Sequence, residues 1–286
     1  MKTYVAITPA RDEEKLLPGM MASMTAQTVK PARWIIVDDG SVDGTGQLLD
    51  AAAVKYPWID PHHLPRDRPR ELGGESVIMR FLPESVWAAH DFILRLDADL
   101  TFPENMVELL MAEFARNDKL GIAGAMLSEP SKDGGWRQVR LPLYHTRGAV
   151  KMYSTACFAA IGGLEGGQGW DAIDEASAMM RGFKTRSFPH INAYHHRPQG
   201  SAGGLYVGRF NTGRAAYRVG YSPIFMLARA ARRVWARPAL IGSLLMVAGY
   251  CEGYLKRLPR GASPELVRFI RQQQLRRLLL RESVWD

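Results

Sequence analysis

The stretch from residue 3 to residue 45 decides the fold: TYVAITPARDEE (3–14), KLLPGMMASMTAQTVKPA (15–32) and RWIIVDDGSVDGT (33–45). The outer segments begin with short apolar runs rich in β-branched residues, at 3–8 and 33–38, which predicts two strands. Between them, apolar residues recur near helical spacing at Leu16, Leu17, Met20, Met21 and Met24. This pattern predicts a β-α-β unit and therefore a parallel sheet.

The same alternation continues to about residue 126 and predicts the rest of an α/β domain. Further helices are expected at 44–55, 76–89 and 103–117, and further strands at 91–99 and 120–126. A chain that alternates in this way forms a mainly parallel sheet with helices on both faces. Ligands of such sheets bind beyond the carboxyl ends of the strands, so the residues that follow each strand are the candidates for a site.

The pattern loosens after Ser128. Two short strands at 136–141 and 148–152 are expected to form an inserted hairpin. Helices are predicted at 154–161 and 172–182, followed by extended segments at 184–188 and 191–196. The Gly-rich stretch 197–208 is predicted to be a mobile loop.

The composition is that of a folded protein in a reducing compartment. Of the 286 residues, 47% are apolar and 23% are charged, which argues against disorder. The two cysteines, Cys157 and Cys251, cannot build a disulfide framework, and the start MKTYVAITPA lacks the long apolar run of a signal peptide. These features indicate a cytoplasmic protein.

Charge divides the chain near residue 208. Residues 1–208 hold 22 Lys and Arg against 25 Asp and Glu, a net charge of −3, whereas residues 209–286 hold 15 against 4, a net charge of +11. A basic block of this kind attracts polyanions, either nucleic acid or an anionic membrane face. We therefore expect one domain at 1–208 that carries the chemistry and a basic helical extension at 209–286.

Acidic side chains follow two of the predicted strands. Asp97 and Asp99 alternate along an extended segment and so project to the same side. Paired carboxylates suit Mg²⁺ or Mn²⁺, which keeps open positions for a diphosphate. A lone Asp-x-Asp pattern is also typical of a solvated loop, but here a buried strand and a helix start flank it. Asp39 follows the second strand, where it would accept hydrogen bonds from a nucleobase or ribose, although DDGS also has the composition of a plain turn.

The motifs TPARDEE, IIVDDGSVDGT, LRLDADL, IGGL and GWDAIDE, in that order, resemble those of the family 2 glycosyltransferases, inverting enzymes with the GT-A fold. The resemblance covers roughly residues 3–200. It implies transfer of a sugar from a nucleoside diphosphate sugar to a hydroxyl, with a divalent cation, Mn²⁺ or Mg²⁺, as cofactor. It assigns Asp99 to the metal. It assigns these residues to the nucleotide: Pro9, Arg11, Glu13, Asp39 and Asp97. Asp97 would contact the ribose or bind through water.

The resemblance also implies a catalytic base at the start of the helix that runs to Gly182. Here Trp170 and Asp171 match the family's Glu-Asp pair, so a tryptophan replaces the usual glutamate. Asp171 lies 11 residues before Gly182, which is the spacing of the family aspartate, and Asp174 lies about one helical turn further on. This spacing makes Asp171 the favoured base and Asp174 the alternative. Acids at a helix start also complement the helix dipole, which would explain whichever of Asp174 and Glu175 is not catalytic.

Histidine and basic side chains extend the predicted site. One of His195 and His196 is expected to face it, since adjacent strand residues point in opposite directions; His196 is assigned to the metal and His195 to the diphosphate or acceptor. The alternative is a strand-end histidine bonded to backbone. Arg197 and the loop at 200–208 would close over phosphates. Further candidates for donor or acceptor contacts are His145, Arg147 and Trp170.

Three amphipathic or apolar segments make up the basic extension. Residues 223–237 form a cationic amphipathic helix, 238–251 are 14 residues without a charge, and Ser263 begins a helix that combines apolar residues with arginine. The uncharged segment is too short to span a bilayer. These segments are expected to lie on an anionic membrane surface or, alternatively, to pack as solvated helices on the first domain. Nucleic acid is not expected, because the arginines alternate with aliphatic residues rather than with stacking aromatics.

Together these features predict an inverting, metal-dependent glycosyltransferase, peripheral on the inner face of the cell membrane. The resemblance to bacterial polysaccharide-building enzymes implies a saccharide acceptor on a polyprenyl carrier. One alternative is a sugar-phosphate nucleotidyltransferase, which would need a Gly-rich phosphate loop where this chain has PARDEE. The other is a nucleotide-binding or membrane-scaffold protein that catalyses nothing.

Overall fold

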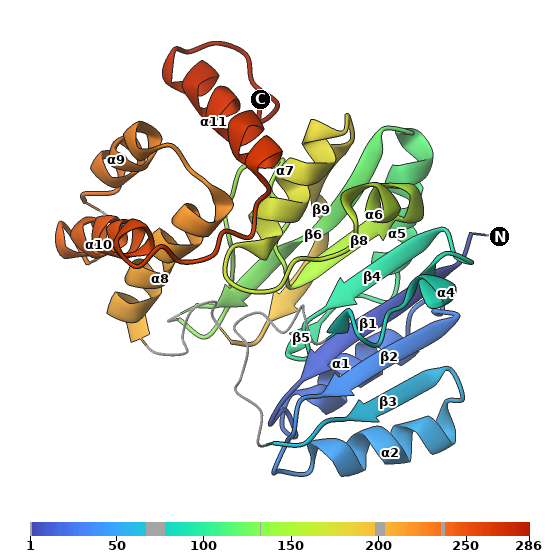
Figure 1. Cartoon of the computed structure of the whole chain (residues 1–286). Helices are drawn as coiled ribbons and strands as arrows, with labels where there is room; N and C mark the ends of the chain where they lie inside the picture. Colours follow the sequence, from blue (N-terminus) through green and yellow to red (C-terminus); the bar gives the residue numbers. More distant parts are fainter. Residues whose placement is uncertain (1, 67–77, 132, 198–203, 236–237) are drawn as a thin grey trace.

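A computed structural model describes residues 2–66, 78–131, 133–197, 204–235 and 238–286. Its centre is a nine-stranded twisted sheet in the order β3-β2-β1-β4-β8-β6-β9-β5, with β7 paired to β6 (Figure 1). The strands are β1 (Tyr4–Ala10), β2 (Arg33–Asp38), β3 (Ile59–His63), β4 (Phe92–Leu96), β5 (Leu100–Thr101), β6 (Leu120–Pro130), β7 (Trp136–Gln138), β8 (Val150–Ser154) and β9 (Lys184–His195).

Helices cover both faces of this sheet. The described helices before residue 200 are α1 (Leu17–Thr25), α2 (Thr45–Lys55), α4 (Glu84–Trp87), α5 (Met106–Arg116), α6 (Thr155–Ile161) and α7 (Trp170–Met180). Met20 of α1 and Leu110 of α5 lie in one hydrophobic core, whereas Trp87 of α4 and Phe158 of α6 lie in another. The sheet is therefore the middle layer of an α/β sandwich.

The predicted parallel sheet is confirmed for β3, β2, β1 and β4, which run parallel in that order. Their sequences are fully or almost fully buried in β1, β2 and β4, as expected of strands covered on both faces. Since these strands are parallel, the loops that follow β1, β2 and β4 meet at one edge of the sheet. The other half is mixed, because β8 runs antiparallel to both β4 and β6.

The predicted inserted hairpin is wrong. Its first half becomes β7, a short exposed strand that pairs with the end of β6. Its second half becomes β8, a central strand between β4 and β6, where Val150, Met152 and Tyr153 are fully buried. Local sequence favours a hairpin here because the region is rich in Gly and polar residues. The burial of β8 depends instead on neighbouring strands that are distant in sequence.

Three further segments differ from their predicted form. The described part of the helix expected at 76–89 is helical mainly at α4, and residues 76–77 lie outside the described residues. The extended segments at 184–188 and 191–196 are joined in one strand, β9, which ends at His195. Of the predicted mobile loop, residues 198–203 lie outside the described part, and residues 204–208 begin helix α8.

The basic extension is helical, as predicted, and lies beside the sheet layer (Figure 1). Its last helix contacts α7 through a small core that includes Ile173, Leu266 and Ile270. Among the described residues no helix is both long enough and apolar enough to cross a membrane. The helices are α8 (Gly204–Val219), α9 (Pro223–Arg232), α10 (Ile241–Leu255) and α11 (Pro264–Leu278).

Candidate functional site

Two carboxylates and one imidazole meet where β4 ends. Asp97 and Asp99 follow β4, and Leu100 of β5 pairs with His195 at the end of β9. This pairing brings His195 Nε2 to 3.2 Å from Asp99 Oδ1. Ligand atoms of Asp97, Asp99 and His195 all lie within 4.8 Å of one another.

The donor set of this acidic cluster fits a divalent cation. Carboxylate oxygens suit Mg²⁺ and Mn²⁺, and a neutral imidazole adds a nitrogen that Mn²⁺ accepts. His195 Nδ1 is buried and has no hydrogen-bond partner among the described residues. No hydrogen bond from this nitrogen therefore fixes the imidazole ring to the described part of the protein. Asp97, Asp99 and His195 are thus the residues that could hold a metal.

Arg197 joins the cluster to the loop after β1. Its Nε donates to Asp99 Oδ2 at 2.9 Å, and its Nη2 donates to Glu13 Oε1. Burial alone would raise the pKa of Asp99, but hydrogen bonds and charge from His195 and Arg197 outweigh it and hold the pKa below its usual value. Asp99 is therefore ionised near neutral pH, as a metal ligand must be. Burial raises the pKa of Glu13, and Arg197 offsets only part of that shift.

The loops after β1 and β2 are tied together beside this cluster. Arg11 Nη1 lies 3.2 Å from Asp39 Oδ2, and both side chains are mostly buried. Asp12 has a φ of 55°. Its carboxylate accepts a hydrogen bond from the Val42 amide, and its own amide donates one to Ser41 Oγ. The structure therefore brings together the loop residues predicted to bind a nucleoside, Pro9, Arg11, Glu13 and Asp39, at the carboxyl edge of β1 and β2.

Helix α7 begins with a buried tryptophan. Trp170 packs so closely on Gly148 that a Cβ there would lie 2.5 Å from the Trp170 ring. The Arg95 guanidinium and the Lys151 ammonium each lie 5.1 Å from the centre of a Trp170 ring, within the range of cation–π attraction. Arg95 also donates to Asp97 Oδ1. The tryptophan that replaces the family's usual glutamate thus links α7 to the acidic cluster through Arg95.

Asp174 is buried and hydrogen-bonded to buried side chains. Lys151 Nζ donates to its two carboxylate oxygens at 2.8 and 3.0 Å, and the Tyr153 hydroxyl donates to Oδ2. Burial raises the pKa of Asp174 to about 7, an effect that the charge of Lys151 reduces. Lys151 and Tyr153 were not predicted from the sequence. The signal was present, because a lysine in the otherwise apolar strand VKMYS needs a buried counter-charge.

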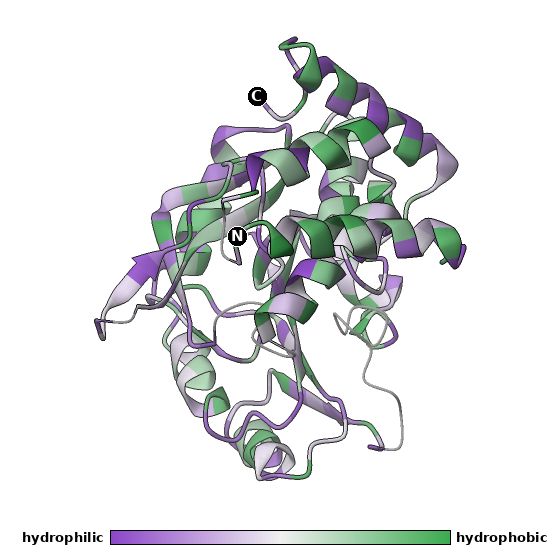
Figure 2. Cartoon of the chain, turned by 90° about the vertical axis from the view of Figure 1, so that its left-hand side faces the viewer, coloured by the Kyte–Doolittle hydropathy of each residue, from purple (hydrophilic) through white to green (hydrophobic). Residues whose placement is uncertain are grey.

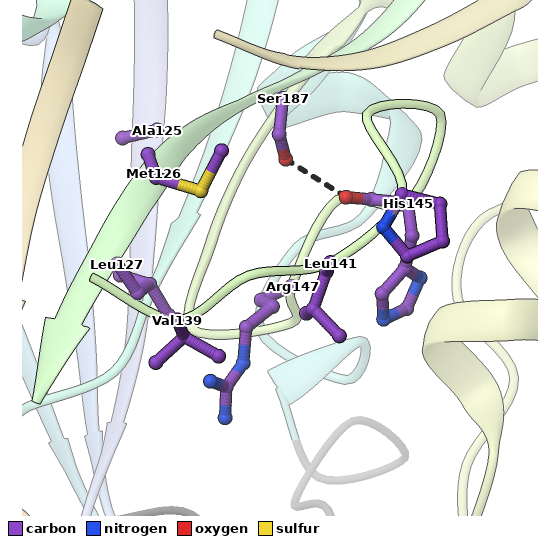
Figure 3. A pocket seen from close by; sticks show the side chains of 9 residues that line it. Ala125, Met126, Leu127, Val139, Leu141, His145, Arg147 and Ser187 are labelled. Carbon is purple, nitrogen blue, oxygen red and sulfur yellow. Dashed lines mark hydrogen bonds between the residues drawn. The ribbon is translucent and has the colours of Figure 1, made fainter. Parts of the chain in front are cut away.

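Glu175 binds the chain segment that precedes β8. Its Oε1 accepts from the Thr146 amide at 2.6 Å and from the Thr146 hydroxyl, while Oε2 lies 2.9 Å from His145 Nδ1. Figure 3 shows His145 and Arg147 in the lining of a small pocket under β6, with Ser187 donating to the His145 carbonyl oxygen. Arg147 Nη1 contacts Glu129 Oε1 at 3.0 Å. His145 is therefore held in one orientation by Glu175.

Asp171 is the accessible acid of α7. It lies in the first turn, and 25% of its side chain is exposed. Its Oδ2 is 4.0 Å from His145 Nε2, the nitrogen opposite the one that faces Glu175. Of the two acids predicted as a base, the structure surrounds Asp174 with buried partners and leaves Asp171 reachable from solvent.

The two adjacent histidines have different surroundings. His195 belongs to the acidic cluster, whereas His196 Nε2 lies 2.9 Å from Thr101 Oγ1 and its ring packs edge-on against Trp136. The prediction that His196 is the one beside the metal-binding aspartate therefore differs from the structure, which places His195 there. The side chains alternate across β9 as expected, but only the pairing of Leu100 with His195 determines which one faces Asp99.

Comparisons with known proteins agree with this geometry. The sequence profile described as "Glycosyl transferase family 2" matches residues 5–164. The undecaprenyl-phosphate 4-deoxy-4-formamido-L-arabinose transferase of Aeromonas hydrophila subsp. hydrophila is 32% identical over 126 residues, which cover 42% of this chain and 36% of that protein. Glycosyltransferase GlyG of Streptococcus pneumoniae serotype 4 is 25% identical over 130 residues, 46% of this chain and 41% of that protein. The matches thus span little more than a third of the length of these relatives.

Solved structures show the same fold at low identity. The mannosyltransferase PcManGT from Pyrobaculum calidifontis, in complex with GDP-Man and Mn²⁺, has a TM-score of 0.55 at 14% identity, over 98% of this chain and 81% of that one. GalNAc-T7 with UDP, GalNAc and Mn²⁺ has a TM-score of 0.61 at 14% identity, over 99% of this chain and 55% of that one. The predicted α/β fold of GT-A type is confirmed.

Proposed function

The chain belongs to glycosyl transferase family 2, and from that premise we propose that it moves a sugar from a nucleoside diphosphate sugar to a hydroxyl group with inversion at the anomeric carbon. One arrangement carries the proposal. The acidic cluster of Asp97, Asp99 and His195 lies at the carboxyl edge of the sheet beside the Arg11–Asp39 pair, and Asp171 is the accessible acid on α7.

The donor would lie along the carboxyl edge of β1, β2 and β4. Asp39 accepts hydrogen bonds from the nucleobase or ribose, and Pro9, Arg11 and Glu13 line the same loop edge. Asp97 contacts ribose directly or through water. Asp99 and His195 would hold Mn²⁺ or Mg²⁺, and Arg197, already bonded to Asp99, would add a positive charge beside the diphosphate.

The chemistry needs a base and a means to stabilise the leaving group. Asp171 takes the proton of the acceptor hydroxyl as that oxygen attacks the anomeric carbon from the face opposite the diphosphate. A divalent cation, when bound, supplies Lewis-acid stabilisation of the charge that develops on the diphosphate. Arg197 contributes to the same stabilisation through its guanidinium. His145 lies beside Asp171, and His145, Arg147 and Trp170 are the candidates for contacts with sugar or acceptor.

We propose a saccharide acceptor on a polyprenyl carrier. Support comes from the Aeromonas relative, whose name includes undecaprenyl phosphate, and from the basic extension at residues 209–286. In this proposal residues 1–208 are the catalytic domain, and the extension holds the protein peripherally on the inner face of the cell membrane.

Calorimetric titration with UDP, GDP, dTDP and CDP, each with and without Mn²⁺, tests the proposal. We expect one nucleoside diphosphate to bind only when Mn²⁺ is present, and we expect Asp99→Ala to abolish that binding. Asp118→Ala is the matched control, because this exposed aspartate precedes β6 at the opposite edge of the sheet. Folded wild-type protein that binds none of the four nucleotides would refute the proposal. Binding that survives in Asp99→Ala would refute the metal assignment.

A further inference from the structure

Helix α10 is apolar on two opposite faces. One face packs against α8 through glycines: a Cβ on Gly249 would lie 2.1 Å from the Phe210 carbonyl oxygen. The other face is exposed and carries no charge, with side chains at Ile241, Leu244, Ala248, Cys251 and Leu255. Protein does not enclose the whole helix. Its outer face also lacks the polar side chains that a solvated helix normally has.

Helix α9 and the turn after it also carry exposed apolar side chains. Ile224 and Leu227 lie one turn apart on α9 and are more than half exposed. Trp235, in the turn, is 87% exposed. The Ser243 hydroxyl donates to the Ala230 carbonyl oxygen at 2.9 Å and so joins the end of α9 to the start of α10. We call the surface formed by Ile224, Leu227, Trp235, Leu240, Ile241 and Leu244 the α9–α10 face.

Three arginines lie at the C-terminal end of α9, close to Trp235 in the sequence. Arg229 and Arg232 lie in the last turn of α9, and Arg233 follows them. Partial burial lowers the pKa of Arg233, and the like charges of Arg229, Arg209 and Arg232 lower it further. The acid of α10, Glu252, is already paired with Arg214 and Lys256.

We propose that the α9–α10 face lies flat on an anionic phospholipid bilayer, with its apolar side chains among the acyl chains and its arginines on the lipid phosphates. Charge complementarity favours this occupant, since lipid phosphates would relieve the repulsion among the arginines. A tryptophan and several leucines flanked by arginine are also the side chains of helices that lie in the membrane interface. A second copy of the chain fits less well, because a symmetric pairing of this face would set like charges against one another.

The position of the two helices suits this role. In Figure 1 α9 and α10 project from the side of the molecule away from β2 and β3, and Figure 2 turns that side toward the viewer, where the helices carry both green and purple segments. No described helix is suited to span a bilayer, so contact would be through this surface. The inference deepens the proposed function, whose acceptor is lipid-linked, but its test uses no sugar nucleotide and can fail independently.

Co-flotation of the purified full chain with vesicles tests the proposal. Vesicles of phosphatidylcholine with about one third phosphatidylglycerol are compared with pure phosphatidylcholine vesicles. We expect the chain to float with the anionic vesicles, and less so at high salt, because about 1 M salt shortens the screening length to about 3 Å. Arg232→Glu/Arg233→Glu should lower the partition coefficient about 30-fold or more. Lys119→Glu/Lys184→Glu has the same change of charge at two exposed lysines, one just before β6 and one at the start of β9, and it should bind nearly as wild type.

The apolar contribution is tested in the same assay. Leu244→Glu, at a side chain that is 61% exposed, should reduce flotation at least tenfold, whereas Val54→Glu, at an exposed residue of α2, should not. Light scattering reports association between copies. Wild-type protein that stays with the soluble fraction, equal losses in the matched controls, or a dimer disrupted by Leu244→Glu would each overturn the proposal. Nucleotide binding that persists in a variant unable to float would leave the proposed function intact.

Discussion

Two aspartates one helical turn apart on α7 have opposite environments. Asp174 is enclosed by Lys151 and Tyr153, and Asp171 is partly open to solvent beside His145. A general base must reach the proton that it takes, so the greater accessibility of Asp171 favours it as the proposed base. Asp174 then has a structural role, which is to keep the ammonium of Lys151 paired under the first turn of α7.

The two aspartates can be separated by a pair of substitutions. Asp171→Asn should lower the turnover number about 10²- to 10⁴-fold and change the free energy of unfolding by less than about 0.5 kcal/mol. Asp174→Asn should lower the free energy of unfolding by about 3 kcal/mol, because Lys151 stays buried without its main counter-charge. Turnover assays and urea unfolding measure the two effects, with Asp118→Asn as the exposed control. A folded, stable and inactive Asp174→Asn beside an active Asp171→Asn would reverse the assignment.

The His145–Glu175 pair predicts a pH dependence of stability. Burial lowers the pKa of His145, but the charge of Glu175 and its hydrogen bond outweigh burial, so the pKa lies above the ordinary value of 6.5. The charges that face the ring are those of Glu175 and Asp171 on α7 and Lys151 on β8. A histidine with a raised folded-state pKa contributes stability that is fully present below the unfolded-state pKa and is lost as pH rises through the folded-state value.

We therefore expect His145→Gln to destabilise the protein most at about pH 5, with a difference from wild type that shrinks as the pH rises above 6.5. Glu175 remains ionised at the lower pH, because burial is outweighed by His145 and Lys151 and the pKa of Glu175 is lowered. Urea unfolding over this pH range measures the difference, and exposed His190→Gln is the control. A difference that did not vary with pH would show that the ion pair is absent.

At the scale of elements, α8 and α10 are held together by backbone contact. Gly213 on α8 faces the Met246 carbonyl oxygen, where a Cβ would lie only 1.9 Å away, and Gly249 on α10 faces Phe210 equally closely. Glycine on each side lets two helices approach until their backbones touch. The apolar residues of α10 therefore lie on two faces, one packed against α8 and one exposed.

Gly249→Ala should lower the free energy of unfolding of the helical extension by about 1–3 kcal/mol, because the new methyl group must separate the two backbones. This loss exceeds the gain of about 0.5–1 kcal/mol that alanine normally gives over glycine within a helix. Gly242→Ala, on the same helix, would meet Pro238 at 3.3 Å and should cost less. Denaturant unfolding followed by circular dichroism compares the two variants. A more stable Gly249→Ala would show that α8 and α10 do not approach so closely.

At the scale of the whole molecule, the basic extension is packed against the helix that carries the predicted base. Arg218 of α8 donates to the Gly166 carbonyl oxygen just before α7, and the core of α11 includes Ile173 of α7. If α9 and α10 lie on a membrane, these contacts would also fix the orientation of the start of α7 relative to that membrane. The net charge is +11 in residues 209–286 and −3 in residues 1–208, and our proposals place membrane contact in the first of these parts and the chemistry in the second.

Much of the site could be predicted because it depends on local pattern. The apolar runs at 3–8, 33–38 and 91–96 form β1, β2 and β4, and parallel strands bring their following loops to one edge whatever the details of packing. That rule places Arg11, Asp39 and Asp97 near one another without any knowledge of side-chain contacts. The helical nature of the extension follows equally from its periodicity and from the cap at Ser263.

The sequence by itself determined the parallel half of the sheet, the acidic residues at its carboxyl edge and the basic helical extension, because strand and helix periods act over a few neighbouring residues. Only the tertiary structure decided that β8 is central, that His195 rather than His196 faces Asp99, and that Lys151 and Tyr153 enclose Asp174. These outcomes depend on strand register and burial. Both are set by contacts between segments far apart in the chain, such as the pairing of Leu100 with His195.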